Sequence, residues 1–342
     1  MIFVFCKIIF NFIINIIITT TMMTTIFNYN FYFGTGSNQK RYIETSPLNL
    51  RPWFLTGFSD AESSFGISIK RKPKSTLGWV VESNFQITMH FKDAQLLKEI
   101  QILLRGVGHI YEYPKQNKVY LVVTRLKDLV DVIIPHFDKY PLQTAKMIDY
   151  QLWKQCIILI RNGSHLTLSG LEEIISIKSA LNLGLSNQVQ KAFPNVVPLI
   201  RPIFIPSEDP LHPDWVSGFI TGDGCLTVSI KSTNQVIATL DINVNERDGP
   251  ALIKIQQFFE GGLIYSNPHN KACSFRVTRL THLTSLIIPH FKSYPLAGNK
   301  LDSFYYWVEI VQMIEQKSHL TPDGLTKIRL LVSKLNKDDN LK

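Results

Sequence analysis

Two acidic residues, Glu62 and Asp223, come at matching places in the chain, each where an apolar helix is expected to end and directly before a strand. A carboxylate there faces the negative end of the helix dipole and carbonyl oxygens without partners, which is unfavourable for an anion. A hard divalent cation resolves this conflict, because carboxylates and backbone carbonyls are oxygen ligands suited to Mg²⁺. The alternative is two solvated acids in unrelated turns, and it is disfavoured because both acids belong to one repeated pattern.

An internal repeat places these acids in two copies of one unit. IIPHFDKYPLQTAK at residues 133–146 returns as IIPHFKSYPLAGNK at residues 287–300, an offset of 154 residues, and VTRL and SHLT recur at the same offset. The segment WFLTGFSDAESSFGISIK, which contains Glu62, corresponds to DWVSGFITGDGCLTVSIK at an offset of 161 residues. The first copy therefore has seven extra residues, which we expect in its basic hairpin between Arg71 and Trp79.

Each copy has the pattern of an α+β unit, an antiparallel sheet with helices on one face. After the opening helix, apolar residues such as Phe65, Ile67 and Ile69 alternate with polar ones, which is typical of a strand with one buried face. A second strand, a helix over about residues 96–104, a hairpin and further helices follow. We therefore expect two tandem, pseudo-symmetric αββαββα units.

The opening helices each carry two small residues four positions apart, Gly57 with Ala61 and Gly218 with Gly222. Residues four apart lie on one face of a helix, so these helices can approach closely and form the central interface of the repeat pair. Glycine on an apolar helix is usually a packing residue only. That interpretation explains the glycines but leaves the acids unexplained.

The polar face of each predicted sheet carries side chains suited to reading DNA. Amides, hydroxyls and carboxylates can pair with the distinct pattern that each base pair presents in the major groove. The residues predicted to contact DNA here are Asn84, Gln86, Thr88 and His90 in the first copy and Lys231, Thr239, Asp241, Asn243 and Asn245 in the second. Because the copies differ at these positions, the target is expected to be asymmetric.

A basic cluster is predicted at the tip of the first hairpin. It consists of Lys70, Arg71, Lys72 and Lys74. Such a cluster can reach phosphates or guanines, although a run of charges is more often an ordinary solvated loop.

The composition is that of a folded protein with a polyanionic partner. The chain has 342 residues, 45% hydrophobic and 18% charged, which is enough for two domains and excludes an extensively disordered chain. The net charge of +9 favours nucleic acid or an acidic membrane surface as a partner. The four cysteines form no C-x-x-C pair, so neither a zinc module nor a disulfide framework is expected.

The expected domains are a leader over residues 1–45, a first repeat over 46–184, a proline-rich linker over 185–212 and a second repeat over 213–342. Proline recurs from Pro194 to Pro210 and cannot continue a helix, so the linker is predicted to be extended. The apolar leader has three interpretations: a membrane anchor, a secretory signal, or a removed or disordered segment whose composition reflects AT-rich coding DNA. The last is favoured and indicates a mitochondrial gene.

LTGFSDAES at residues 55–63 and VSGFITGDG at residues 216–224 resemble the two motifs of a LAGLIDADG homing endonuclease of the single-chain, organellar intron-encoded type. The resemblance extends from about Trp53 to Asn336 and includes both PHF-x-x-YPL-x-x-x-K segments. It implies a saddle-shaped DNA-binding surface with the two motif helices packed at a pseudo-twofold axis. A monomer is expected, without an obligate protein partner, because both halves are already present.

The resemblance also implies the site residues, with Mg²⁺ (or Mn²⁺) as cofactor. The implied catalytic residues are Glu62, Asp223, Lys146 and Lys300, and the implied metal ligands are the two acids with the carbonyls of Ala61 and Gly222. Ordinary surface lysine is the alternative for Lys146 and Lys300. Ser63 in place of the closing glycine and Thr221 in place of the family's first acid are departures that leave the metal ligands intact.

The expected function is metal-dependent double-strand cutting of a long, asymmetric DNA target that leaves short 3′ overhangs. An intron RNA maturase is the main alternative, because maturases closely resemble these endonucleases and some perform both tasks. A catalytically silent DNA-binding protein and a membrane protein defined by its leader are further alternatives. The two intact acids favour cutting.

Overall fold

The computed structural model describes residues 50–339 of the chain. The leader predicted for residues 1–45, with its three interpretations, lies outside the described residues. Within the described part, no helix combines the length and the apolar character needed to cross a membrane.

The first repeat follows the predicted order αββαββα, with further helices after it. Its elements are α2 (Pro52–Glu62), β1 (Ser63–Arg71), β2 (Trp79–His90), η1 (Phe91–Asp93), α3 (Ala94–Leu103), β3 (His109–Tyr113), η2 (Pro114–Gln116), β4 (Lys118–Val123), α4 (Leu126–Asp128), η3 (Leu129–Ile133), α5 (Ile134–Lys139), α6 (Lys146–Arg161), η4 (Ser164–Leu166) and α7 (Leu168–Ser179).

The second repeat has the same order and is reached through a short helix, α8 (Asn187–Ala192). Its elements are α9 (Pro213–Asp223), β5 (Gly224–Ile230), β6 (Val236–Asn245), η5 (Glu246–Asp248), α10 (Gly249–Phe259), β7 (Leu263–Asn267), η6 (Pro268–Asn270), β8 (Ala272–Val277), α11 (Leu280–His282), η7 (Leu283–Ile287), α12 (Ile288–Ser293), α13 (Asn299–Glu315), η8 (Ser318–Leu320) and α14 (Pro322–Asp339).

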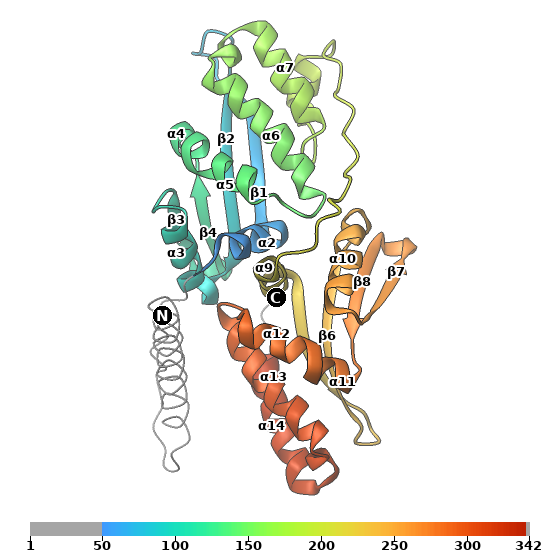
Figure 1. The fold of residues 1–342 in the computed structure, drawn as a ribbon. Helices are drawn as coiled ribbons and strands as arrows, with labels where there is room; N and C mark the ends of the chain where they lie inside the picture. The colour runs from blue at the N-terminus through green and yellow to red at the C-terminus, as the bar shows by residue number, and fades with distance from the viewer. Residues whose placement is uncertain (1–49, 340–342) are drawn as a thin grey trace, which may run out of the picture. The chain divides into compact units, whose positions relative to one another are not determined.

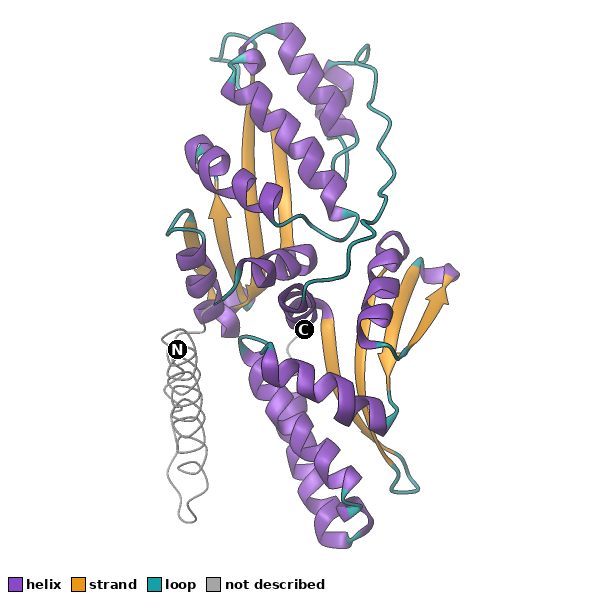
Figure 2. Ribbon diagram, in the orientation of Figure 1, coloured by secondary structure: helices purple, strands orange, loops and turns teal. Residues whose placement is uncertain are grey.

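Each repeat builds one four-stranded antiparallel sheet, with strand orders β1-β2-β4-β3 and β5-β6-β8-β7. Phe65 lies opposite Phe85 in the first sheet and Leu226 opposite Leu240 in the second. All four side chains are buried, as the alternating pattern predicted. Helices cover the face to which they point (Figure 2). The α+β fold class is confirmed, and the polar side chains alternate onto the other face of each sheet.

Two predictions about connecting segments are wrong in part. Asp93 and Asp248 end equivalent turns at an offset of 155 residues, so six of the seven extra residues lie in the β1–β2 hairpin and the seventh lies between η1 and β3. The linker is not extended throughout, because α8 forms in it. This helix ends at Ala192, before the first of the regularly spaced prolines at Pro194, and a helix is possible there because no proline interrupts it.

The two opening helices, α2 and α9, pack side by side at the centre of the described structure (Figure 1). A Cβ atom added to Gly57 would lie 2.0 Å from the carbonyl oxygen of Trp215, and one added to Gly218 would lie 2.0 Å from that of Phe54. The backbones therefore touch where a side chain is missing. The predicted close approach at the small residues is confirmed.

Gly218→Ala should destabilise the protein, because its methyl group would overlap the backbone of α2. Overpacking of a core typically costs about 1–3 kcal/mol, which outweighs the gain of about 1 kcal/mol in helix propensity from glycine to alanine. We expect a lower free energy of unfolding in chemical denaturation. Gly249→Ala is the control: this residue has φ −50° at the start of α10, and an added Cβ would lie 3.4 Å from Cys273 Sγ, its nearest neighbour. Equal losses in the two variants would contradict the role of the glycine contact.

Candidate active site at the paired helix ends

Glu62 and Asp223 are the last residues of α2 and α9, and the packing of these helices brings them together. The Glu62 side chain lies against Gly222 of the other helix: a Cβ on that glycine would be 3.1 Å from Glu62 Cγ and 3.6 Å from its Oε1. Burial and, second, the negative charge of Glu62 raise the pKa of Asp223 to about 6, although Lys146 and Lys300 oppose the rise. The two acids therefore share one site and sense each other's charge.

Lys146, the first residue of α6, points at the C-terminal end of α2. Its Nζ donates to the carbonyl oxygens of Ser59 (2.9 Å), Ala61 (3.4 Å) and Ser63 (2.7 Å). Among these acceptors, the carbonyl of Ala61 lies in the last turn of α2, where a helix leaves carbonyls without an N–H partner, and the ammonium supplies a donor for it. Burial lowers the pKa of Lys146, and the negative charge of Asp60 is the largest of several that oppose this shift.

Lys300 has the equivalent position at the start of α13. Its Nζ donates to the carbonyl oxygen of Gly222 at 3.5 Å and to that of Gly224. The carbonyls of Ala61 and Gly222, predicted as metal ligands, therefore each accept a hydrogen bond from the lysine of their own repeat.

Asp60 holds the loop that leads into Lys146. Its buried carboxylate accepts hydrogen bonds from the backbone N–H groups of Gln143 (2.8 Å) and Thr144 (3.2 Å) and from the Thr144 hydroxyl (2.6 Å). The indole N–H of Trp215, on α9, donates to the same carboxylate at 2.8 Å. Burial raises the pKa of Asp60 to about 6, and these hydrogen bonds oppose the rise, so the group is mainly ionised at neutral pH.

Thr221 takes the place of this acid in the second repeat and holds its loop by a single bond. Its hydroxyl donates to the carbonyl oxygen of Ser217 at 2.7 Å and accepts from the backbone N–H of Ala297 at 3.3 Å. The two loops that carry the lysines are therefore not held equally.

The histidine of each PHF segment contacts a hydroxyl of the opening helix, and this hydroxyl also bonds to the loop that precedes Lys146 or Lys300. His136 Nε2 lies 3.2 Å from the Thr56 hydroxyl, which itself donates to the carbonyl oxygen of Tyr140 at 3.0 Å. The ring nitrogen is therefore the donor to the hydroxyl. Burial lowers the pKa of this histidine to about 4. The second repeat has the same arrangement and the same pKa shift, with Ser217, His290 and Tyr294.

A pocket of about 460 Å³ lies beside Glu62 and is lined by both repeats, although Asp223 is not part of its lining. Five of the predicted site residues line it, namely Glu62, Thr88, His90, Gly222 and Lys300. Among residues 50–339, no group of three or more His, Cys, Asp and Glu side chains is placed to hold a metal ion. A cation here would depend on two carboxylates supplemented by carbonyl oxygens, which is a donor set suited to a hard ion.

Several of the residues predicted to contact bases in the first repeat are engaged with neighbours. The Gln86 amide donates to the Thr88 hydroxyl at 2.9 Å. Asn84 covers Gly66, where an added Cβ would lie 1.9 Å from Asn84 Oδ1. His90 Nδ1 accepts from the backbone N–H of residue 92 at 3.2 Å and so caps η1.

In the second repeat, Asn245 caps η5 in the same way, by accepting from the backbone N–H of residue 247 at 3.2 Å. Thr239 lies in β6 opposite Thr227, and Lys231 is exposed in the β5–β6 turn. Asn243 is exposed and its amide lies 3.5 Å from an Asp241 carboxylate oxygen. These residues are placed on or at the ends of the polar strand face.

Asp241 is paired with Arg276, which the sequence did not single out. Arg276 Nη2 lies 2.8 Å from Asp241 Oδ2, and the guanidinium carbon lies 5.7 Å from the centre of the Tyr265 ring. Asp241 and Arg276 are cross-strand neighbours in β6 and β8. The carboxylate predicted to contact a base thus holds an arginine in a fixed orientation on the polar face of the second sheet.

The predicted basic cluster is divided between a strand and a loop. Lys72 and Lys74 lie in the β1–β2 loop, whereas Lys70 and Arg71 lie in β1, and Lys70 forms an ion pair with Glu82 at 2.6 Å. Since β1 has nine residues, about 30 Å separates this cluster from the paired acids.

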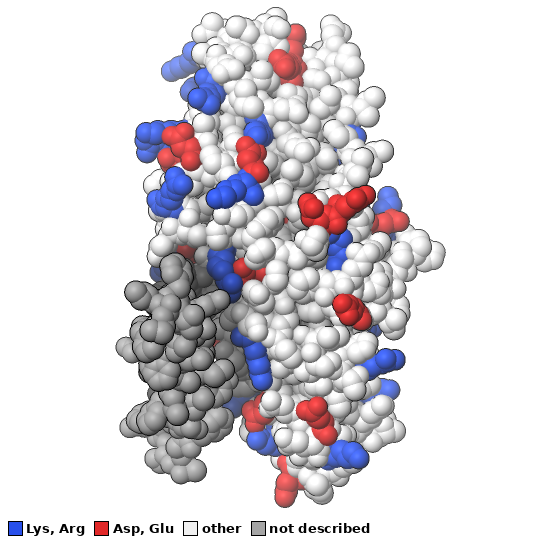
Figure 3. All heavy atoms as spheres, in the orientation of Figure 1, with Lys and Arg blue, Asp and Glu red and all other residues white. Residues whose placement is uncertain are grey.

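Acidic and basic side chains are interspersed on the face of the molecule shown in Figure 3. This is the face where helices lie in front of the sheets (Figure 2). The excess positive charge of the chain is therefore not gathered into one patch on this helical face.

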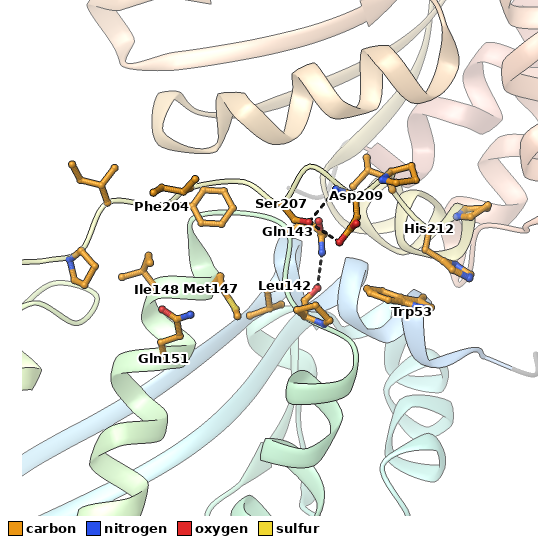
Figure 4. A pocket seen from close by; sticks show the side chains of 17 residues that line it. Trp53, Leu142, Gln143, Met147, Ile148, Gln151, Phe204, Ser207, Asp209 and His212 are labelled. Carbon is orange, nitrogen blue, oxygen red and sulfur yellow. Dashed lines mark hydrogen bonds between the residues drawn. The ribbon is translucent and has the colours of Figure 1, made fainter.

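The linker covers a separate, largely apolar pocket of about 830 Å³. Phe204 of the linker faces Met147 and Ile148 of α6, and Trp53 stacks on His212 with 5.4 Å between ring centres (Figure 4). None of the predicted catalytic, metal-binding or DNA-binding residues lines this pocket.

The family model described as LAGLIDADG endonuclease matches residues 55–157 and 216–311, which is more than half of the chain. The chain belongs to the LAGLIDADG endonuclease family. Both matched segments contain one opening helix, one sheet and one of the two lysines, so the resemblance inferred from the motifs is confirmed.

Two curated relatives match most of the chain. It is 34% identical to "Probable intron-encoded endonuclease 3" of Neurospora crassa over 294 residues, which are 84% of this chain and 55% of the relative. It is 35% identical to "Probable intron-encoded endonuclease 2" of the same fungus over 288 residues, 82% of this chain and 64% of the relative. The chain thus spans about half to two thirds of the length of these curated relatives.

A crystal structure of the I-SmaMI LAGLIDADG homing endonuclease bound to cleaved DNA matches with a TM-score of 0.80 and 33% identity. The match covers 84% of this chain and 97% of that chain. The fold class predicted from the sequence is confirmed by this likeness.

The departure at the end of the first LAGLIDADG motif has a structural explanation. The Ser63 hydroxyl donates to the carbonyl oxygen of Ser59 at 2.7 Å and so closes α2 with an extra hydrogen bond. Asp60 and Arg276 are site residues that the sequence analysis missed. Asp60 was visible as the acid whose counterpart is Thr221, while nothing in a single sequence pairs Arg276 with Asp241.

Asp60→Ala should destabilise the protein more than Thr221→Ala. The first change leaves buried donors on Gln143, Thr144 and Trp215 without their acceptor, and each such loss costs about 1–3 kcal/mol. We expect a loss of at least about 2 kcal/mol for Asp60→Ala and about 1 kcal/mol for Thr221→Ala in chemical denaturation. A larger loss for the threonine variant would contradict the unequal anchoring of the two loops.

The two buried histidines should make stability depend on pH. The unfolded chain takes up protons near pH 6.5 and the folded chain only near pH 4, so stability rises with pH between these values. Each histidine can raise the free energy of unfolding by about 2 kcal/mol between pH 5 and 6.5. We expect the stability difference between the wild type and His136→Gln to be larger at pH 7 than at pH 5. Titration of other groups, including Asp60, affects both proteins equally and so cancels in this comparison. The prediction would be refuted if the wild type and His136→Gln differed in stability by the same amount at both pH values.

Proposed function

We propose that this protein is a site-specific DNA endonuclease that cuts both strands of a long target and serves intron homing. The observation that carries the proposal is the pair of acids at adjoining helix ends, each with a lysine of its own repeat on the same helix end. A shared acid pair with duplicated lysines suits two closely spaced cuts, one in each strand. The names of the fungal relatives and the DNA-bound I-SmaMI structure support this assignment.

The residues at this site fit a divalent cation, Mg²⁺ or Mn²⁺. Glu62 and Asp223 offer hard carboxylate oxygens, and the pKa of Asp223 is raised by burial and by the charge of Glu62, both of which a bound cation would offset. We assign the carbonyls of Ala61 and Gly222 as further ligands. Asp60 is not assigned, because four hydrogen-bond donors already engage its oxygens. When bound, such an ion activates water, neutralises phosphate charge and stabilises the leaving oxygen.

Lys146 and Lys300 are assigned to the two scissile phosphates. Each ammonium lies at a helix end beside one of the acids, where it can donate hydrogen bonds to a phosphate oxygen or to the attacking water. The lowered pKa of Lys146 makes it a better proton donor than an exposed lysine. The acids, in turn, keep the ammonium charged.

The polar sheet faces are assigned to the major groove of the target. The two faces differ in their side chains, so each half of the protein would read a different half-site and the target would be asymmetric. Lys72 and Lys74 at the distal end of β1 suit phosphates far from the cuts. Cuts across the minor groove with short 3′ overhangs complete the proposal, by analogy with the family.

We further propose a mitochondrial monomer in which residues 46–184 and 213–342 form the two halves, residues 185–212 the linker and residues 1–45 a leader. The leader is rich in Ile, Phe, Asn and Thr, a composition that AT-rich coding DNA would produce, and this composition and the intron-encoded relatives in a fungus support the location. RNA binding of the maturase type is kept as an outcome of the test below.

Cleavage of the intronless DNA that flanks the gene's own insertion point tests the proposal. We expect the full chain to cut both strands with Mg²⁺, and Glu62→Gln and Asp223→Asn to reduce the rate by at least about 10³-fold. Binding of the same DNA should survive both changes. Glu208→Gln and Asp209→Asn, exposed acids of the linker, make the same chemical changes away from the site and should leave the rate unchanged.

Tight binding of the target without cutting by the wild type would overturn the nuclease assignment. Preferential binding of the intron RNA in the same assay would then support the maturase. Cutting that is insensitive to either acid change would show that the site lies elsewhere.

Arg276→Ala should relax the base preference at one position of the target. An arginine held by Asp241 and Tyr265 presents its planar fork for two hydrogen bonds to guanine, a contact worth about 1–3 kcal/mol. Selection of cleavable targets from a library randomised over one half-site measures the preference. Lys271→Ala removes an exposed charge after β7 and should weaken binding evenly across sequences. An unchanged preference in the Arg276 variant would exclude this role.

A further inference from the structure

An aspartate from the second repeat holds the start of the lysine-bearing helix of the first repeat. Asp248 Oδ1 accepts a hydrogen bond of 2.9 Å from the backbone N–H of Ala145, the residue that precedes Lys146. The other carboxylate oxygen lies 3.4 Å from Arg247 Nε. A carboxylate is favourable at a helix N-terminus, where backbone N–H groups lack partners and the dipole is positive.

An equivalent hydrogen bond joins the first repeat to the start of the lysine-bearing helix of the second. Asp93 Oδ1 accepts a hydrogen bond of 2.8 Å from the backbone N–H of Asn299, the residue that precedes Lys300. Gly298 lets the chains approach: its φ is +59°, and an added Cβ would lie 2.4 Å from Asp93 Oδ1. A side chain at residue 298 would block this contact.

The two contacts are equivalent under the repeat symmetry and cross between the repeats. Asp93 and Asp248 each end the short 3-10 helix, η1 or η5, that follows the second strand of their repeat. Both helices are capped at their start by a strand residue, so the aspartates sit in defined turns and not in loose loops. An interface contact with no further role would not have to recur immediately before both lysines.

Resting on the proposed endonuclease function, we propose that Asp93 and Asp248 are positioning residues that act crosswise, each fixing the catalytic lysine of the opposite repeat. Asp248 determines where α6 begins and therefore where Lys146 meets the end of α2. Asp93 does the same for α13 and Lys300. The machinery for each strand thus depends on a residue from the other half, which couples the two cuts.

Chemical labelling of the full chain tests the positioning itself, independently of any cutting. Amine-reactive labelling followed by peptide mass spectrometry measures the reactivity of each lysine. We expect Asp248→Ala to increase labelling of Lys146 by about 3-fold or more and to leave Lys300 within about 1.5-fold, because a freed helix start exposes the buried ammonium. Asp93→Ala should have the opposite selectivity. Glu246→Ala, an exposed acid in the same turn as Asp248, is the charge-matched control and should change neither.

Strand-specific cutting then tests the functional consequence. On a supercoiled plasmid with one target, each alanine variant should slow one strand by about 10-fold or more and accumulate nicked circles, since small displacements of a catalytic group are costly. The two variants should favour nicks in opposite strands. Asp248→Asn and Asp93→Asn keep an acceptor oxygen and should restore both rates to within about 3-fold of the wild type.

Labelling changes that are absent, or that are equal at both lysines, would overturn the crosswise positioning. Equal slowing of both strands, with no rescue by asparagine, would reduce the aspartates to ordinary interface residues. If the wild type does not cut but the labelling is crosswise, the endonuclease proposal fails while the positioning contact stands.

Discussion

The rest of the structure depends on the backbone contact between α2 and α9. Gly57 and Gly218 allow each helix to rest on a carbonyl oxygen of the other, so both helices end at one place and deliver Glu62 and Asp223 to a single site. The same packing gathers two negative helix ends and two carboxylates, which is unfavourable without cations. Lys146 and Lys300 supply two positive charges, and a divalent cation would supply the rest. The helix contact therefore concentrates negative charge at one place, and the two lysines with a bound cation would neutralise it.

The two repeats resemble each other more in the contacts that position the lysine-bearing helices than in the contacts made by Asp60 and its counterpart Thr221. The PHF histidines, the lysines and the crosswise aspartates recur in both halves with nearly the same contacts. The repeats differ at Asp60 and its counterpart Thr221. Asp60 accepts three hydrogen bonds from the loop before Lys146 and one from Trp215, whereas Thr221 makes one hydrogen bond to the loop before Lys300. The lysine-bearing loop of the first repeat is therefore held more firmly than that of the second, in keeping with the asymmetric target proposed above.

The sequence predicted the features that follow from a periodic pattern or from the internal repeat. It did not predict the roles of residues that depend on a tertiary partner. The alternation in β1 and the small residues of α2 and α9 predicted the sheets and the central contact, because each signal is local. The matched acids followed from the repeat, and the two lysines from the resemblance to the family. The pairing of Asp241 with Arg276 depends on strand register, and the contacts of Asp93 and Asp248 join residues 206 and 103 positions apart. The short helix α8 was missed because the prolines beside it dominated the pattern.

The lysines and the proposed cation share the same carbonyl oxygens, those of Ala61 and Gly222. A cation and an ammonium beside one carbonyl oxygen repel each other, so we expect the ammonium to move away from its carbonyl when a cation binds. The long, flexible lysine side chain permits this movement without displacement of the helix that carries it. Asp93 and Asp248 hold the starts of α13 and α6 through backbone N–H groups, so Lys300 and Lys146 could exchange their carbonyl contacts for a phosphate without movement of these helices. Firm anchoring of the helix starts and mobility of the ammonium groups are therefore complementary requirements of the same site.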